Sequence, residues 1–144
     1  MTVHLLDVNV LIALIWPAHV SHAIAQRWLA NDSNGGWATC PLTQAAFVRI
    51  LSNPAFSRDA VAPLQATEIL EAALRHPLHQ FWPDEIGLVE AIRPVAKQLL
   101  GHQQVSDAYL LGLAVHRKGR FLTMDRAILG LLPKSSHSPV TLLS

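Results

Sequence analysis

Three aspartates, Asp7, Asp107 and Asp125, have a residue type and surroundings suited to chemistry. Asp7 ends one apolar run, Asp125 closely follows another, and Asp107 opens a helical pattern. The carboxyl ends of parallel strands share one sheet edge, where open α/β sheets bind ligands. Carboxylates gathered there repel one another unless a cation lies between them, and oxygen ligands suit Mg²⁺ or Mn²⁺. The pattern therefore predicts a metal-dependent phosphodiesterase site.

Each aspartate also has a purely structural interpretation. An Asp in a first helical turn commonly caps the helix or interacts with its dipole, and this interpretation stays open for Asp107 and Asp125 taken singly. Asp7 interrupts a nearly continuous apolar stretch over residues 5–11, where burying a lone carboxylate is costly. We therefore expect Asp7 to have a hydrogen-bonding partner or a metal ion.

The composition indicates a single domain over residues 1–144. The chain is 51% hydrophobic and 15% charged, so it can fill a core. Its formal net charge of +1 neither requires nor excludes nucleic acid as a ligand. Cys40 is the only cysteine, which suits a reducing compartment, and the apolar residues 8–16 are too few to span a bilayer. With no basic leader before the first apolar run, we expect a cytoplasmic protein without a membrane span.

Strand-like and helix-like segments alternate along the chain. Short apolar runs predict strands, and apolar residues at helical spacing predict helices between them. Strands are expected at residues 3–6, 37–40, 80–82, 120–123 and 139–143, and helices at 8–16, 20–30, 43–51, 64–74, 85–100, 107–116 and 125–132. Pro94 should kink the fifth helix, and Ser106 should cap the sixth. The alternation predicts an α/β fold with a central parallel sheet of four to five strands, covered by helices on both faces.

Three segments resemble the motifs of a known family. Residues 5–11 (LLDVNVL) resemble the opening motif of PIN domains, and residues 106–111 (SDAYLL) and 121–127 (FLTMDRA) resemble their closing pair. The order and spacing of these motifs, and the chain length, are similar to those of VapC toxins from type II toxin–antitoxin systems. The resemblance covers nearly the whole chain and implies the three-layer α/β/α PIN fold.

The resemblance also implies a function and a set of site residues. It implies an endoribonuclease that depends on Mg²⁺ or Mn²⁺, cuts RNA to leave a 5′-phosphate, forms a homodimer and is inhibited by a cognate antitoxin protein. Asp7, Asp107 and Asp125 match the family's acidic positions and would be the metal ligands. Asn9 and Thr123 match its small polar neighbours, which orient carboxylates or water molecules.

One position departs from the family's pattern. PIN domains commonly have a glutamate early in the third helix and an arginine five residues later, and here Gln44 and Arg49 stand at these positions. Gln44 can offer a carbonyl oxygen but supplies no charge and cannot act as a general base, so a second metal would bind poorly. Asp84 or Glu85 would replace the missing carboxylate if their loop reaches the cleft. The candidates for holding RNA phosphates are Arg49, Arg117, Lys118, Arg120 and Arg126.

Other functions remain open at this point. The missing glutamate favours a PIN-fold module that binds RNA or protein without catalysis, whereas the three retained aspartates argue against it. A phosphotransferase of the haloacid-dehalogenase or response-regulator type needs a second Asp close after the first, where this chain has Asn9. Zinc binding by His19 and His22 lacks further ligands at suitable spacing, and Cys40 lies in an apolar run typical of core cysteines.

Overall fold

Five short parallel strands form one sheet in the described part of the molecule. The structure is a computed structural model, and it describes residues 1–56, 58–132 and 138–144. The strand order is β3-β2-β1-β4-β5, and these strands are His79–Phe81, Trp37–Thr39, His4–Leu6, Arg120–Thr123 and Val140–Leu142 respectively. Leu5 of β1 is in register with Ala38 of β2 and with Phe121 of β4. The predicted parallel sheet is confirmed.

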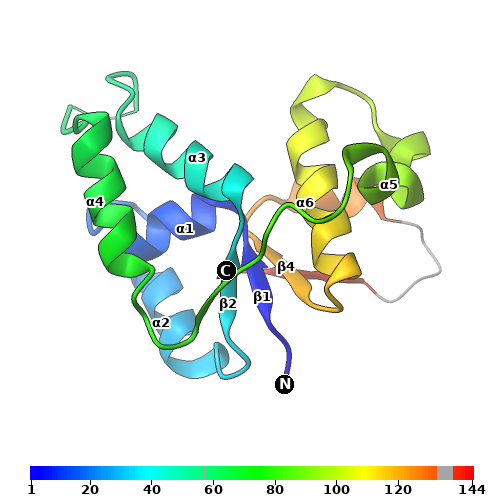
Figure 1. The fold of residues 1–144 in the computed structure, drawn as a ribbon, viewed down its shortest axis with the longest axis horizontal. Helices are drawn as coiled ribbons and strands as arrows, with labels where there is room; N and C mark the ends of the chain where they lie inside the picture. Colours follow the sequence, from blue (N-terminus) through cyan, green and yellow to red (C-terminus); the bar gives the residue numbers. More distant parts are fainter. Residues whose placement is uncertain (57, 133–137) are drawn as a thin grey trace.

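One face of the sheet is covered by the helices of the amino-terminal half (Figure 1). These helices are α1 (Val8–Ile15), α2 (His22–Asp32), α3 (Pro41–Leu51) and α4 (Pro63–Ala73). Successive side chains of a strand point to opposite faces, so Leu6, Trp37 and Leu122 point toward this layer. They pack there with Leu11 and Phe47, and all five side chains are buried.

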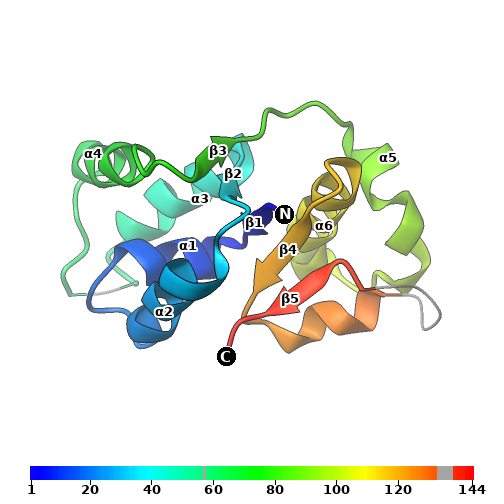
Figure 2. The same cartoon turned by 90° about the horizontal axis from the view of Figure 1, so that it is seen from below.

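The opposite face carries the helices of the carboxyl-terminal half. These are α5 (Leu88–Ile92), α6 (Val105–His116) and the 3₁₀ helices η1 (Arg93–Gln98), η2 (His102–Gln104) and η3 (Arg126–Leu131). Leu5, Phe121 and Val140 belong to the core on this side, together with Leu113 and Leu131. Figure 2 shows the sheet between the two groups of helices. The expected three-layer α/β/α arrangement is therefore confirmed.

Two helices of this second layer differ from the helices that the sequence predicted. Within the expected helix at residues 85–100, only Leu88–Ile92 is α-helical, and Arg93–Gln98 forms a 3₁₀ helix. Pro94 has no N–H to donate to an α-helical interior, which favours the tighter form. The helix expected at residues 125–132 is the 3₁₀ helix η3. Across residues 1–56, 58–132 and 138–144, none of the helices combines the length and apolarity needed to cross a membrane.

Ser106 does not cap α6, which was the expectation from sequence, because the helix already begins at Val105. The turn before it is held by Gln104, whose Oε1 accepts hydrogen bonds from the backbone N–H groups of Leu100 (2.6 Å) and Gly101 (3.3 Å). This longer side chain orders the entry into the helix without a hydroxyl cap. Asp107 still falls in the first turn of α6.

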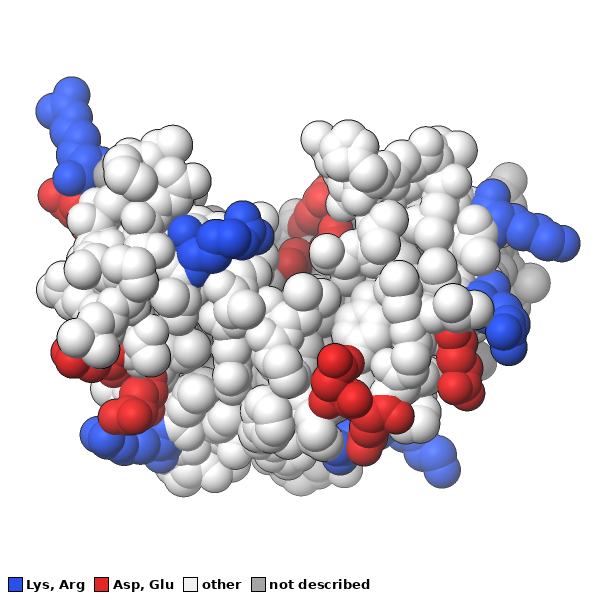
Figure 3. Space-filling view, turned by 45° about the horizontal axis from the view of Figure 1, so that its top comes forward, with Lys and Arg blue, Asp and Glu red and all other residues white. Residues whose placement is uncertain are grey.

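The chain passes directly from strand to helix at the carboxyl edge of the sheet. Asp7 joins β1 to α1, Cys40 joins β2 to α3, and Asp125 precedes η3 after β4. The backbone N–H of Asp7 donates to the carbonyl oxygen of Leu122 (2.9 Å), which ties the ends of β1 and β4 together. Figure 3 shows a hollow between the two halves of the molecule, with acidic side chains at its bottom and a basic side chain on its rim.

Candidate active site

Asp7 lies at the end of β1, and only 5% of its surface is exposed. The Thr123 hydroxyl, at the end of the neighbouring β4, donates a hydrogen bond to Asp7 Oδ2 (2.7 Å) and accepts one from the backbone N–H of Asp125 (3.1 Å). Burial raises the pKa of the Asp7 carboxyl, and the hydrogen bond from Thr123 opposes that rise. Thr123 thus holds one oxygen of Asp7 in place and links it to the backbone at Asp125.

Asp107 approaches the other two aspartates from the opposite helical layer. It stands in the first turn of α6, and its side chain is half-buried. Burial, and then the negative charges of Asp7 and Asp125, raise the pKa of Asp107 from its ordinary value of 3.8 to about 6. Asp107 lines the same pocket as Asp125, so the fold brings these two carboxylates to one cleft.

Asp125 is exposed and uses part of its carboxylate locally. Its Oδ1 accepts a hydrogen bond from the backbone N–H of Ala127 (2.9 Å), which caps η3. The capping interpretation therefore applies to Asp125, although the residue also shares a pocket with Asp107. Among the described residues, no three His, Cys, Asp or Glu side chains stand close enough together to form a ready-made metal site. The three carboxylates are thus neighbours rather than a closed ligand cage.

Gln44 is oriented by a chain of side-chain hydrogen bonds. Its Nε2 donates to Thr39 Oγ1 (3.0 Å), and Thr39 Oγ1 lies 2.8 Å from Nε2 of His79. Burial lowers the pKa of His79, so its ring is neutral near pH 7 and Nε2 can accept the hydroxyl proton of Thr39. The amide nitrogen of Gln44 is therefore engaged by Thr39.

The other predicted site residues fall into two groups by their position relative to the aspartates. Asn9 is exposed in the first turn of α1, two residues after Asp7. Arg126 directly follows Asp125, and Arg49 is exposed on α3, the helix that carries Gln44. The other three candidate cations, Arg117, Lys118 and Arg120, lie before or at the start of β4, at the opposite end of that strand from the aspartates.

Two of those three cations have partners of their own. Arg117 pairs with Glu85 and lies over the ring of Trp82, 5.6 Å from its centroid. Arg120 donates to Thr141 Oγ1 and to the carbonyl oxygen of Val140, both at 2.7 Å. These contacts belong to the packing of α6 and β5 and do not extend to the aspartates.

The two acids of the loop after β3 both contact residues outside the aspartate group. Asp84 accepts a hydrogen bond from the hydroxyl of Tyr109, and Glu85 forms an ion pair with Arg117. Burial, followed by the hydrogen bond and charge of Asp84, raises the pKa of Tyr109, so this hydroxyl stays a donor. Both acids of this loop therefore have structural partners outside the aspartate group.

The alternative sites of the sequence analysis have structural explanations. His19 Nδ1 accepts a hydrogen bond from the backbone N–H of Ser21 (2.9 Å), and His22 Nδ1 lies 2.7 Å from the carbonyl oxygen of Ala13. Cys40 is buried in the core at the start of α3.

Sequence reasoning missed Thr39, His79 and Gln104. Thr39 and His79 are 40 positions apart and meet only because β2 and β3 pair in parallel. Gln104 shows no distinguishing pattern, since it stands in the polar stretch His102–Gln104 before α6. A polar residue at the end of a strand, such as Thr39, was the one available signal.

The donor chemistry of the aspartate group fits a hard divalent cation. The carboxylates of Asp7, Asp107 and Asp125 provide oxygen ligands of the kind that Mg²⁺ and Mn²⁺ prefer. A cation would relieve the mutual repulsion that contributes to the raised pKa of Asp107. Asp125 keeps a second carboxylate oxygen besides the one that caps η3.

Comparison with known sequences identifies close relatives along most of the chain. A family model described as the PIN domain matches residues 4–130. Ribonuclease VapC39 of Mycobacterium tuberculosis is 44% identical over 124 residues, which cover 86% of this chain and 89% of the relative. Ribonuclease VapC38 of the same organism is 39% identical over 140 residues, which cover 97% of each chain. Both relatives therefore match over nearly their full length.

Solved structures with the same fold include two VapC systems. A crystal structure of VapBC2 from Rickettsia felis, bound to a DNA fragment from the promoter, matches with a TM-score of 0.67 and covers 99% of both chains at 12% identity. VapC20 of Mycobacterium tuberculosis, a toxin that cleaves the sarcin–ricin loop, matches with a TM-score of 0.55 at 15% identity, covering 81% of this chain and 85% of that one. At these identities the likeness concerns the fold alone.

Proposed function

We propose, because this chain belongs to the PIN-domain family and to its VapC ribonucleases, that it is a Mg²⁺- or Mn²⁺-dependent endoribonuclease and the toxin of a type II toxin–antitoxin pair. The observation that carries this proposal is the arrangement of the three aspartates: Thr123 links Asp7 to Asp125 at the carboxyl edge of the sheet, and Asp107 lines the same pocket as Asp125. The relatives named as ribonucleases support RNA as the substrate, and the alternative is a PIN-fold module that binds without catalysis.

The site residues take distinct roles in this reaction. Asp7 and Asp107 are the main ligands for the cation, and Asp125 completes the ligand set or positions the attacking water. The bound cation supplies charge neutralisation at the scissile phosphate and lowers the pKa of the water. Thr123 keeps Asp7 oriented through its hydrogen bond, and Asn9 and Gln44 offer neutral polar groups at the rim.

The charges of the cleft explain why a cation must accompany the RNA. Acidic side chains at the bottom of the hollow repel a phosphodiester, so RNA approaches closely only when the negative charge is balanced (Figure 3). Of the predicted cations, we assign contacts with the RNA backbone to Arg126, which follows Asp125, and to Arg49 on α3, both of which are exposed. Arg117 and Arg120 are excluded from this role by their other partners.

The partners follow from the same assignment. We propose that a cognate antitoxin protein inhibits the enzyme, as the VapBC complex among the structural neighbours suggests, and that the toxin acts in the cytoplasm as a homodimer. An antitoxin that covers the cleft would block RNA and contribute cationic groups to the acidic bottom. Co-expression with a candidate antitoxin, followed by co-purification, checks this assignment.

Cleavage of a defined RNA panel in Mg²⁺, in Mn²⁺ and in EDTA tests the proposed activity. We expect the native chain to cut in either metal and not in EDTA, and Asp7→Asn to reduce the rate by at least roughly a hundredfold, because it removes a ligand charge. Asp32→Asn, an exposed aspartate on α2, serves as the matched control and should cut normally.

The outcomes separate the two candidate functions. Metal-dependent cutting that is lost in Asp7→Asn but kept in Asp32→Asn supports the nuclease. A folded native chain that binds RNA or an antitoxin but cuts nothing in either metal would establish the non-catalytic module, with Gln44 in place of the glutamate as the reason.

A further inference from the structure

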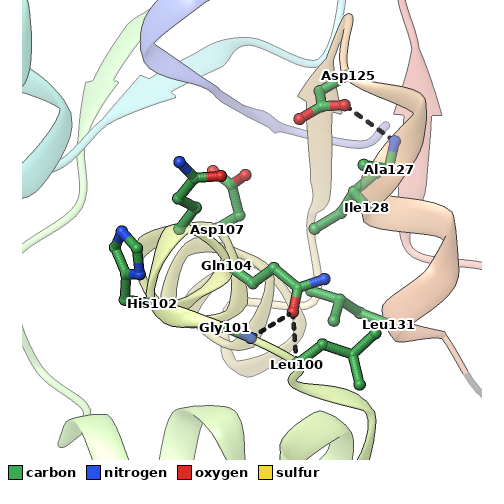
Figure 4. Close-up of a pocket in the computed structure, with 10 residues that line it drawn as sticks. Leu100, Gly101, His102, Gln104, Asp107, Asp125, Ala127, Ile128 and Leu131 are labelled. Atoms are coloured by element: carbon green, nitrogen blue, oxygen red, sulfur yellow. Dashed lines mark hydrogen bonds between the residues drawn. The ribbon is translucent and has the colours of Figure 1, made fainter.

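A pocket of about 390 Å³ opens beside the aspartates, between η2 and η3 (Figure 4). Asp107 and Asp125 form part of its wall, so it is continuous with the candidate active site. Its lining includes the buried side chains of Ile128 and Leu131, which are 3% and 1% exposed, and the side chain of Leu100, which is 91% exposed. The pocket therefore combines an apolar floor with an apolar edge that nothing in the described chain covers.

One polar group in this pocket has a fixed orientation. The Oε1 atom of Gln104 accepts the N–H groups of Leu100 and Gly101, so its Nε2 must be the other end of the amide. Figure 4 shows that nitrogen on the side of the amide that faces Ile128 and Leu131. Gln104 thus presents a preorganised hydrogen-bond donor above an apolar floor.

We propose that this pocket receives one unstacked nucleobase of single-stranded RNA next to the scissile phosphate, and that it favours guanine or uracil, which carry a carbonyl oxygen where adenine and cytosine carry an amino group. This inference rests on the proposed nuclease function and adds a substrate preference to it. A base has flat apolar faces and a polar edge, and sequence-specific recognition of RNA commonly takes splayed bases of this kind. The volume lies within the range of about 300–1,000 Å³ that is typical of small-ligand sites.

The charges of the pocket disfavour an anionic group, and the Gln104 donor favours an uncharged acceptor. A phosphate group would meet the carboxylates of Asp107 and Asp125, which repel it. A cationic side chain from a protein partner would pair with these carboxylates but would leave the Gln104 donor without an acceptor. A base carbonyl is an uncharged acceptor and fits both conditions.

The preference for guanine and uracil follows from the edge that meets Gln104. Guanine O6 and uracil O4 are acceptors, whereas adenine and cytosine carry amino groups at the corresponding positions. An amino group facing the Gln104 donor leaves both groups without a partner, which disfavours those bases. We expect a preference of at least roughly fivefold at one position beside the cut, since one net hydrogen bond gives about that factor.

A single-stranded RNA pool with a randomised centre tests this inference, with the product ends sequenced. The informative variant is Gln104→Glu, because one carboxylate oxygen keeps the bonds to Leu100 and Gly101 while the other replaces the donor by an acceptor. We expect the preference to move from guanine and uracil toward adenine and cytosine. Gln65→Glu, on the exposed face of α4, is the matched control and should keep the native preference.

The readout is a ratio between bases within one enzyme, so a change in overall rate does not affect it. An unchanged base ratio in Gln104→Glu, with cleavage still lost in Asp7→Asn, overturns the base pocket and leaves the nuclease standing. If the native chain cuts no RNA, the proposed nuclease function is overturned. Binding of the same RNA pool in the presence of Ca²⁺ then tests whether the pocket recognises a base. Retention of guanine- and uracil-containing RNA by the native chain but not by Gln104→Glu supports it, and equal retention rejects it.

Discussion

Asp107 links the electrostatics of the site to the stability of the fold. Its pKa of about 6 in the folded chain lies above the ordinary value of 3.8, so the folded state binds the proton more tightly than the unfolded state. The protonated carboxyl of Asp107 therefore contributes favourably to the free energy of unfolding. This contribution is fully present below about pH 4 and is lost as the pH rises through about 6. Above that range, the charged carboxylate destabilises the metal-free fold.

Replacing this carboxylate by an amide should consequently stabilise the metal-free protein. We expect Asp107→Asn to raise the free energy of unfolding by about 1 kcal/mol at pH 7.5 in EDTA and by little at pH 4, the gain being limited because water screens a half-buried charge. Urea unfolding at both pH values measures this, with Glu68→Gln on the surface of α4 as the control. A loss of stability in Asp107→Asn at pH 7.5 would contradict the assignment, and Mg²⁺ should stabilise only the native chain.

Gln44, unlike Asp107, brings no charge to the protein. Its side chain is held by hydrogen bonds that run through the uncharged groups of Thr39 and His79. Thr39 and His79 fix the orientation of the Gln44 amide. A carboxylate at this position would offer the same reach with a full negative charge, and Thr39 could turn its hydroxyl proton toward it. The charge of residue 44 is therefore expected to set how strongly a cation binds.

Gln44→Glu should bind Mn²⁺ about tenfold more tightly than the native chain, because affinity for hard cations rises with the charge of the ligands. Isothermal titration calorimetry measures this directly. Gln65→Glu adds the same charge on α4, away from the cleft, and should leave the affinity unchanged. Equal affinities in Gln44→Glu and the native chain would mean that residue 44 does not contact the cation.

At the scale of elements, the contact between α5 and α6 depends on a glycine. A Cβ atom at Gly112 would lie 2.1 Å from the carbonyl oxygen of Ala91, so the two backbones touch where a side chain would stand. Since α6 carries Asp107 and Gln104 immediately precedes it, this close approach helps to place both residues at the cleft. The packing of two helices thus positions the site from a distance.

Gly112→Ala should lower the free energy of unfolding by about 1–3 kcal/mol, because the added methyl group forces the two helices apart. Gly130→Ala is the control, since a Cβ at Gly130 in η3 meets no atom within 4 Å. Thermal and urea unfolding of both variants compare the two positions. Similar stability in Gly112→Ala and Gly130→Ala would show that α5 can move away from α6 without loss of stability. The close contact at Gly112 would then not be needed to hold the two helices in place.

At the scale of the whole molecule, apolar surface remains between the two halves. Leu42 at the start of α3 and Leu88 at the start of α5 are 40% and 47% exposed, and both line one pocket of about 460 Å³ near the carboxyl edge of the sheet. Asp84 and Tyr109 lie in the same pocket. An exposed apolar region of this kind, in a chain that is 51% hydrophobic, is typical of a surface that another protein covers.

We expect this region to be the homodimer interface. Light scattering coupled to gel filtration should give twice the monomer mass of 15.8 kDa for the native chain, and Leu88→Arg should shift it to the monomer. Leu64→Arg, on α4 with 71% of the leucine exposed, controls for the added charge and should stay dimeric. A dimer that persists in Leu88→Arg would place the dimer interface elsewhere. A native chain that is monomeric would contradict the expected homodimer.

The sequence by itself determined the strands, the layers and the positions of the three aspartates. These features are local, because alternating apolar runs predict strands and helices, and an Asp at the end of such a run is visible without knowing its neighbours. The exceptions are local too: Pro94 turned half of an expected helix into a 3₁₀ helix, and a glutamine rather than Ser106 ordered the start of α6.

Only the tertiary structure decided which side chains meet. Thr123 bonds to Asp7 across 116 positions because β4 lies beside β1, and Thr39 bonds to His79 because β3 lies beside β2. Strand order arises from long-range packing of both sheet faces, which no window of sequence contains. The same packing turned Arg117 and Asp84 toward structural partners and left Gln104 beside the aspartates, because each side chain's neighbours depend on elements that are distant along the chain.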